Sequence, residues 1–219
     1  MYDALENLYD GIAVYGWRRL YDVAEAYAIP PSVQPKLQYC GFILRDLPMV
    51  DSAAIRQEHG LPLNGPLIVA TVGGGFDGYP VLAATLDALE QLRPSIPDLA
   101  AILVTGPFMP AEQRAALQAR ATASCRILAQ ADAFQLMAAA DAIVSMGGYN
   151  SVCEALAVGR PLVIVPRQTH KVEQTIRAEI LAGHDLARCI HPKDLSGLSL
   201  AEALDWALSC DRVVYALRV

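Results

Sequence analysis

Short apolar runs alternate with amphipathic stretches over most of this chain, from about residue 60 onward. The apolar runs predict six strands, at residues 66–72, 101–105, 126–129, 141–145, 162–165 and 186–190. Between them, apolar residues recur every three or four positions, as on helices that pack one face against a sheet. This alternation predicts an α/β fold of the Rossmann-like type, with a doubly wound parallel sheet and right-handed crossovers.

The helices predicted from the same spacing lie at residues 52–59, 79–92, 110–121, 133–140, 172–182 and 200–208, with another between the fourth and fifth strands. Proline and glycine mark several of their ends. Pro94 follows the helix at 79–92, and Gly183 follows the helix at 172–182.

The first 46 residues have a different pattern. Residues 11–16 and 38–43 are predicted strands, and a helix between them, at 20–27, stops before Pro30-Pro31. This segment is too short to form a sheet with its own phosphate loop. We therefore expect residues 1–46 to be a short N-terminal appendage, the remnant or end of a preceding domain, and residues 47–219 to form the main domain.

Composition narrows the function classes. Hydrophobic residues make up 54% of the chain and charged residues only 18%, which predicts a packed core and little disorder. The formal net charge of −6 argues against a nucleic-acid-binding protein, which needs a basic surface. Since no apolar run reaches the ~18 residues that span a bilayer and no signal peptide is evident, we expect a cytoplasmic protein.

The cysteines and histidines do not predict a metal or disulfide site. The five cysteines lack CxxC spacing, and the four histidines are scattered along the chain. Cysteines in such a pattern are typically small buried residues. We expect no metal ion and no other cofactor.

A glycine-rich turn, residues 73–78, follows the first predicted strand of the main domain. Glycines such as Gly74 and Gly75 allow a backbone to approach a diphosphate closely, although a tight strand-to-helix turn would need them equally. The next strand, residues 101–105, carries no acidic residue. This absence argues against a NAD-dependent dehydrogenase, which usually holds its ribose with an acid there.

The most informative stretch runs from Ser145 to Leu156, where a buried strand meets a double glycine and then a helix. The N–H groups of the first helical turn and the helix dipole favour a phosphate group. The residues that we place at the diphosphate are Gly148, Tyr149, Asn150 and Ser151. Glu154 lies about one turn further on, within reach of ribose hydroxyls. The structural alternative is ordinary helix capping by Asn150 or Ser151.

This Gly-Tyr-Asn-Ser-x-x-Glu-Ala-Leu run, followed by Gly-x-Pro and an apolar strand, resembles the donor-binding C-terminal half of GT-B glycosyltransferases. The resemblance is to the glycosyltransferase family 28 C-terminal domain, which includes the bacterial N-acetylglucosaminyltransferase that forms lipid II and uncharacterised bacterial relatives. It implies recognition of a UDP-sugar or a similar NDP-sugar. It also implies hexosyl transfer with inversion once an acceptor domain completes the enzyme.

The resemblance assigns further residues. Glu173 and Gln174 match positions that bind donor-sugar hydroxyls, and the chain at Ala129 and Gln130 matches the place that receives the base through backbone groups. For Glu173 the alternative is a solvated side chain at a helix N-terminus. Asp132, just beyond the base-binding positions, is also a candidate helix cap.

The chain departs from the family in two respects. Met146 stands where relatives carry His or Arg beside the pyrophosphate, so Arg167 or Lys171 is the candidate replacement cation. The acceptor domain, which supplies the catalytic base in relatives, is almost wholly absent. The catalytic residues are therefore unknown, and whether the chain is an enzyme depends on its completion.

Three functions fit the sequence: the donor half of a glycosyltransferase, a non-catalytic nucleotide-sugar-binding subunit or sensor, and an enzyme resembling UDP-sugar 2-epimerases. The expected partners are a nucleotide-sugar donor and either a chain carrying the acceptor domain or a second copy in a homodimer. Peripheral membrane association is compatible with this picture, and nucleic acid is not an expected partner.

Overall fold

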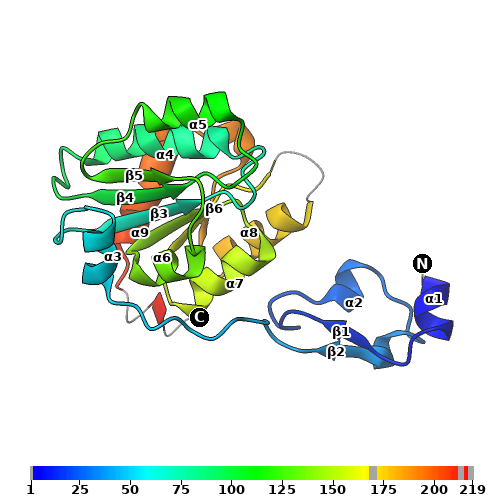
Figure 1. Ribbon diagram of the computed structural model, residues 1–219. Helices are drawn as coiled ribbons and strands as arrows, with labels where there is room; N and C mark the ends of the chain where they lie inside the picture. The colour runs from blue at the N-terminus through cyan, green and yellow to red at the C-terminus, as the bar shows by residue number, and fades with distance from the viewer. Residues whose placement is uncertain (1, 168–171, 212–214, 217–219) are drawn as a thin grey trace. The chain divides into compact units, whose positions relative to one another are not determined.

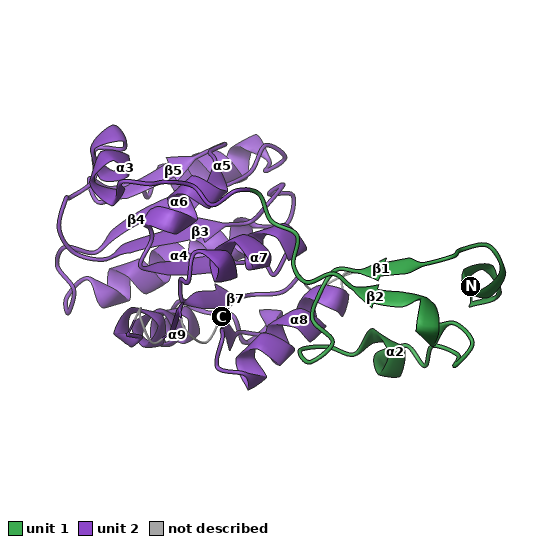
Figure 2. Cartoon of the chain, turned by 90° about the horizontal axis from the view of Figure 1, so that it is seen from below, with its two compact units in different colours: residues 1–45 green, residues 46–219 purple. Residues whose placement is uncertain are grey.

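The computed structural model describes residues 2–167, 172–211 and 215–216. The chain divides into two compact units, residues 1–45 and residues 46–219 (Figure 2). Unit 1 comprises helix α1 (Tyr2–Asn7), strand β1 (Ile12–Val14), helix α2 (Val23–Ala26), the 3₁₀ helix η1 (Gln34–Lys36) and strand β2 (Leu37–Tyr39).

Unit 1 is organised around two short parallel strands, in which Ile12 lies opposite Leu37. Helix α2 begins later than the sequence predicts because Asp22 caps it: the Asp22 carboxylate accepts the N–H of Ala24 at 2.9 Å. The buried core of this unit is small and includes Ala24, Ile29 and Val33. Its interpretation as the end of a preceding domain stays a prediction.

Unit 2 is built on a sheet of six described strands. They are β3 (Leu67–Thr71), β4 (Ala100–Val104), β5 (Cys125–Leu128), β6 (Ala142–Ser145), β7 (Leu162–Ile164) and β8 (Arg188–Cys189). Their order is β5-β4-β3-β6-β7-β8, and every pair is parallel. The predicted Rossmann-like α/β fold is confirmed.

The helices of unit 2 are α3 (Ser52–Glu58), α4 (Tyr79–Leu92), α5 (Ala111–Gln118), α6 (Ala133–Ala139), α7 (Tyr149–Ala157), α8 (Val172–Gly183) and α9 (Gly197–Ser209), with the 3₁₀ helix η2 (Pro192–Asp194). Helices α4, α5 and α9 cover one face of the sheet, while α3, α6 and α7 cover the other (Figure 1). Strands β3 and β4 are buried along their whole length because both faces are covered. In the ranges described, no helix has the length and apolar character needed to cross a membrane.

The strand order reverses between β3 and β6. From β3 the chain moves outward through β4 to β5, and then crosses back to add β6, β7 and β8 on the other side. The loops that leave β3 and β6 therefore diverge toward opposite faces, opening a crevice at the carboxyl edge of the sheet. Ligands of open α/β sheets bind at such a point.

Helix α6 offers a direct test of local capping. The Asp132 carboxylate accepts the N–H of Phe134 at 3.1 Å and the N–H of Gln135 at 3.5 Å. We expect Asp132→Ala to lower the free energy of unfolding by about 1 kcal/mol, since those donors lose their acceptor. Urea unfolding measures this change. Asp132→Asn should retain most of the stability, and equal losses in both variants would contradict a capping role.

Candidate functional site

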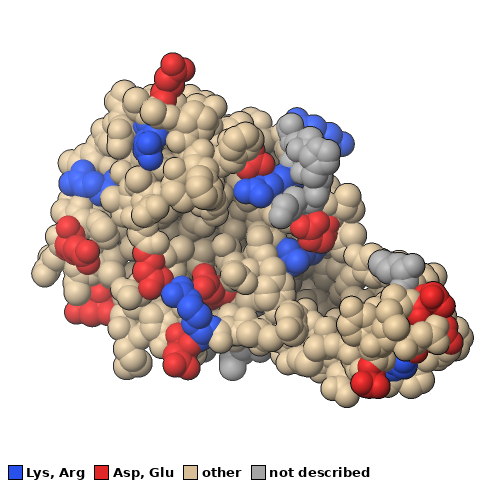
Figure 3. Space-filling view, turned by 45° about the vertical axis from the view of Figure 1, so that its right-hand side comes forward, with Lys and Arg blue, Asp and Glu red and all other residues tan. Residues whose placement is uncertain are grey.

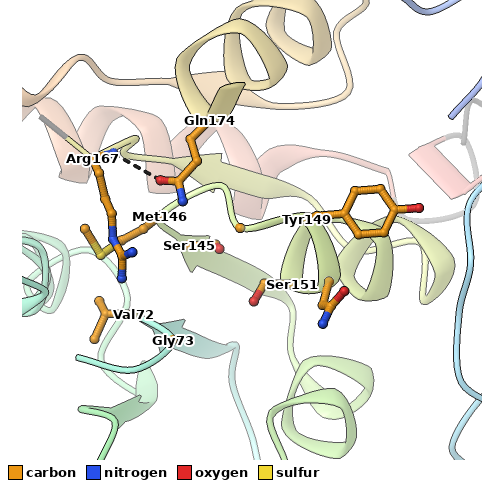
Figure 4. Close-up of a pocket in the computed structure, with 10 residues that line it drawn as sticks. Val72, Gly73, Ser145, Met146, Tyr149, Ser151, Arg167 and Gln174 are labelled. Atoms are coloured by element: carbon orange, nitrogen blue, oxygen red, sulfur yellow. Dashed lines mark hydrogen bonds between the residues drawn. The ribbon is translucent and has the colours of Figure 1, made fainter. Parts of the chain in front are cut away.

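A cavity of about 330 Å³ opens at the carboxyl ends of β3 and β6, where the strand order reverses. It is lined by Val72, Gly73, Ser145, Met146, Gly148, Tyr149, Asn150, Ser151, Arg167 and Gln174 (Figure 4). These residues come from the loop after β3, the end of β6 and the turn that follows it, the first turn of α7, the segment after β7, and α8. The four residues predicted at the diphosphate, Gly148 to Ser151, all belong to this lining.

The turn between β6 and α7 depends on Gly147. Its φ of +76° lies in the left-handed region, and a Cβ there would sit 3.0 Å from Cγ2 of Ile164. The Gly147 N–H donates to Oγ of Ser145 at 3.3 Å. Glycine therefore lets the chain turn sharply enough for α7 to begin two residues later.

The first turn of α7 presents backbone donors to the cavity. Gly148 is the N-cap residue, with no side-chain cap, and the first helical bond runs from the Val152 N–H to the Gly148 carbonyl at 3.0 Å. Across the part of the chain that is described, the N–H groups of Gly148, Asn150 and Ser151 have no acceptor. Neither Asn150 nor Ser151 caps the helix. Open amides at the positive end of a helix dipole form a site for an anion.

Arg167 is the one lysine or arginine in the described lining of the cavity. Its Nε lies 3.1 Å from Oδ1 of Asp77, which belongs to the loop after β3. Met146 is buried in the same wall, beside the Arg167 side chain (Figure 4). Of the two cations proposed to replace the family's His or Arg, Arg167 thus lies at the cavity, and Lys171 lies outside the described residues.

Gln174 reaches the cavity from α8, with only 5% of the residue exposed. Its Oε1 accepts the N–H of Arg167 at 3.3 Å (Figure 4), which ties the segment after β7 to the helix. Its amide nitrogen has no acceptor among the described residues. Glu173 is exposed and is not part of the cavity lining.

Arg177 contacts the turn that opens α7 without lining the cavity, and it was not predicted from the sequence. It lies one turn beyond Gln174 on α8, and its Nη1 donates to the Gly147 carbonyl at 2.6 Å. Its guanidinium carbon is 5.7 Å from the centroid of the Tyr149 ring. Burial lowers the pKa of Arg177 below its ordinary value. The signal available in the sequence was its spacing of three from Gln174, which places both side chains on one helix face.

Two glycines predicted at the diphosphate lie beside the cavity. Gly73 lines it, whereas Gly74 and Gly75 do not. A Cβ at Gly75 would lie 1.9 Å from the Thr105 carbonyl oxygen, so this glycine permits contact between the loops after β3 and β4. A Cβ at Gly74 would lie 3.1 Å from Cδ2 of Phe108.

The remaining predicted residues also lie outside the cavity lining. Glu154 is half-buried on α7, about one turn beyond Asn150. Ala129 and Gln130 are exposed and directly follow β5, two strands away from β3 at the same edge of the sheet.

Neither the surface charge seen in Figure 3 nor the possible metal ligands gather into a distinct cluster among the described residues. On the face seen in Figure 3, lysine and arginine side chains are interspersed with acidic ones and form no continuous basic stripe among the residues drawn in colour. Among the described residues, no three His, Cys, Asp or Glu side chains lie close enough together to hold a metal ion.

The parallel sheet and its strand order match the fold of the C-terminal half of GT-B glycosyltransferases. Residues 69–212 match the model of the glycosyltransferase family 28 C-terminal domain. This match covers more than half of the chain, and the protein belongs to that family.

Individual relatives agree with this assignment. An uncharacterized glycosyltransferase of Methanopyrus kandleri is 24% identical over 208 residues, covering 87% of this chain and 55% of the relative. The glycotransferase of kitacinnamycin superposes with a TM-score of 0.69 at 21% identity, covering 97% of this chain and 49% of that one. Os79 of O. sativa, solved with UDP and deoxynivalenol-3-glucoside, superposes with a TM-score of 0.67 at 15% identity. This match covers 99% of this chain and 49% of the Os79 chain. The chain thus spans about half the length of these relatives.

Proposed function

We propose that residues 46–219 bind a nucleotide-sugar donor, a UDP-sugar or a similar NDP-sugar, and act as the donor half of a glycosyltransferase. The observation that carries this proposal is the convergence of three open backbone amides and the Arg167 guanidinium on one cavity. A diphosphate matches this arrangement because it offers several anionic oxygens both to amides that have no acceptor among the described residues and to the Arg167 guanidinium, which is otherwise paired with Asp77. The UDP complex of Os79 supports the choice of nucleotide.

The chemistry proposed for the completed enzyme is transfer with inversion. A base, supplied by an acceptor domain, removes the proton of an acceptor hydroxyl, and the oxygen attacks the anomeric carbon of the sugar. The bond from that carbon to the diphosphate oxygen breaks, and its electron pair stays on the leaving diphosphate. The amides of α7 and Arg167 stabilise this growing negative charge.

The rest of the donor is placed along the edge of the sheet. We assign the Gln174 amide nitrogen, together with Glu173, to the sugar hydroxyls, and the Glu154 carboxylate to the ribose. The backbone at Ala129 and Gln130 then receives the base. Support comes from the position of Gln174 in the cavity wall and of Glu154 one turn along α7. Polar groups matched to hydroxyls select strongly against ligands that lack them.

The function is tested by calorimetry with UDP, UDP-sugars and uridine, and by assays for product formation. Binding of UDP-sugars without turnover is the result expected of a donor half. Conversion of a UDP-sugar to its 2-epimer would instead assign the epimerase alternative. Binding that is unaffected by added acceptor-domain chains would favour a sensor. If no nucleotide or nucleotide-sugar binds, the proposed function is wrong.

The ribose assignment has its own test. We expect Glu154→Ala to weaken UDP binding by about 1.5 kcal/mol, the lower end for a hydrogen bond to a charged group, because Glu154 is only half-buried. Calorimetry with inorganic pyrophosphate is the internal control, since this ligand has no ribose and its affinity should not fall. Glu179→Ala, on α8, is the matched acidic variant and should leave UDP binding unchanged. Equal UDP affinity for Glu154→Ala and wild type would remove Glu154 from the site.

A further inference from the structure

The peptide between Gly147 and Gly148 is held from one side by a buried arginine. Nη1 of Arg177 donates to the Gly147 carbonyl oxygen at 2.6 Å, a short hydrogen bond from a charged donor. A trans peptide is planar, so the carbonyl of Gly147 and the N–H of Gly148 point in opposite directions. By fixing the carbonyl, Arg177 also fixes the direction of the Gly148 N–H, which points away from α8.

The Gly148 N–H belongs to a residue that lines the cavity and has no acceptor within the described ranges. Gly148 has no side chain to hinder rotation of its peptide. Gly147 has a φ of +76°, in the left-handed region that few residues other than glycine adopt. A glycine pair of this kind needs an external contact to hold one orientation. The hydrogen bond from Arg177 supplies that contact, and it also polarises the peptide toward stronger donation at the N–H.

Arg177 forms no ion pair among the described residues, although the Glu173 carboxylate, one turn earlier on α8, interacts with its charge at longer range. Arg56, which is also buried, lies 3.6 Å from the Asp141 carboxylate, whereas no described carboxylate lies within ion-pair distance of Arg177. Its guanidinium contacts the Gly147 carbonyl and the Tyr149 ring, and Cys153 also lies near enough to act on its charge. Burial disfavours such a charge, which is why the pKa of Arg177 is lowered, and an anion bound nearby would offset that cost.

On the cavity side of the same turn, the cavity is lined by Met146, which carries no charge. We propose that Arg177 is a positioning residue for the donor diphosphate. It orients the Gly148 N–H toward the phosphate oxygens and provides, from behind the glycine turn, the positive charge that Met146 does not. This inference rests on the proposed function, and it specifies which part of the ligand the α7 turn recognises.

The test compares ligands with and without phosphate. Arg177→Gln should weaken UDP binding about tenfold or more, as expected when a charge-assisted contact is lost, while uridine affinity changes less than about twofold. Arg177→Lys keeps the charge but loses the planar guanidinium, and its UDP affinity should fall between wild type and Arg177→Gln. Calorimetry gives the UDP values, and competition against UDP gives those for uridine.

Arg160 provides a matched control. It is also a buried arginine whose pKa burial lowers, and its Nη2 donates to the Ala138 carbonyl at 2.9 Å. It lies two residues before β7, at the amino edge of the sheet and away from the cavity. Arg160→Gln should destabilise the fold through the same loss of a buried contact, yet leave the ratio of UDP to uridine affinity unchanged.

The outcomes separate this inference from the function on which it rests. If wild type does not bind UDP, the proposed function fails and this inference fails with it. Suppose that wild type binds UDP. If Arg177→Gln then lowers the affinities for UDP and uridine by the same factor, or lowers neither affinity, only the role of Arg177 is overturned. Should Arg177→Gln not fold, Arg177→Lys decides: a selective loss of UDP affinity supports the role, and unchanged UDP affinity refutes it.

Discussion

Replacing Gly75 by valine should prevent unit 2 from folding stably. A Cβ at this position would lie 1.9 Å from the Thr105 carbonyl oxygen, and that oxygen belongs to the backbone and has little freedom to move. The φ of +90° adds strain for any L-residue with a side chain. We expect a loss of more than about 4 kcal/mol in the free energy of unfolding, from the combination of overpacking and backbone strain. Circular dichroism and urea unfolding measure it.

Gly73 is the matched control because it shares the left-handed backbone without the steric conflict. Its φ is +62°, and a Cβ at this position would meet no other atom within 4 Å. Gly73→Ala should therefore cost only the backbone term, about 1 kcal/mol. If Gly75→Val unfolds at the same urea concentration as Gly73→Ala, the loops after β3 and β4 do not approach each other as closely as the structure indicates.

Replacing Arg167 by glutamine should produce the largest loss of ligand affinity among the cavity variants. Arg167 is the one lysine or arginine in the described lining, and Met146 leaves the neighbouring position without a charge. We expect UDP affinity to fall about a hundredfold, close to 2.7 kcal/mol, as when a charged group loses its hydrogen-bonded partner. Uridine, which has no phosphate, should bind as it does to wild type. Calorimetry with both ligands at low salt makes the comparison.

Replacing Asp77, the partner of Arg167 in this ion pair, should change UDP affinity in the opposite direction. Its Oδ1 lies 3.1 Å from Nε of Arg167, so the carboxylate competes with an incoming diphosphate for that guanidinium. Asp77→Asn should raise UDP affinity, but by no more than about fivefold, because the pair is partly exposed and solvent screens it. A decrease in UDP affinity would mean that Asp77 holds Arg167 in its binding position.

Much of the fold was predictable because its determinants are local. The apolar run at residues 66–72 contains β3, observed at Leu67–Thr71, and the helical spacing at residues 79–92 coincides with α4. Both follow from periodicity along a few turns or a few pleats of chain. The strand predicted at residues 186–190 corresponds to β8, which has only two residues. A strand this short has too few positions to show an apolar pattern.

The site was predictable where its residues are contiguous. Gly148 to Ser151 were placed together because a strand, a glycine turn and a helix N-terminus have a fixed relation along the chain. The pairing of Asp77 with Arg167 was not predicted, since it joins loops that are 90 residues apart in sequence. Which glycine of residues 73–75 lines the cavity also depends on contact between two separate loops.

The sequence by itself determined the class of fold, the family and the position of the glycine turn that opens α7, because strand and helix periodicity and the Gly-Tyr-Asn-Ser-x-x-Glu run are properties of neighbouring residues. Only the tertiary structure decided that β6 pairs with β3, that Arg167 and Gln174 share one cavity wall, and that Arg177 supports the glycine turn from behind. These contacts join distant segments, and the order of parallel strands, which no local pattern encodes, brings those segments together.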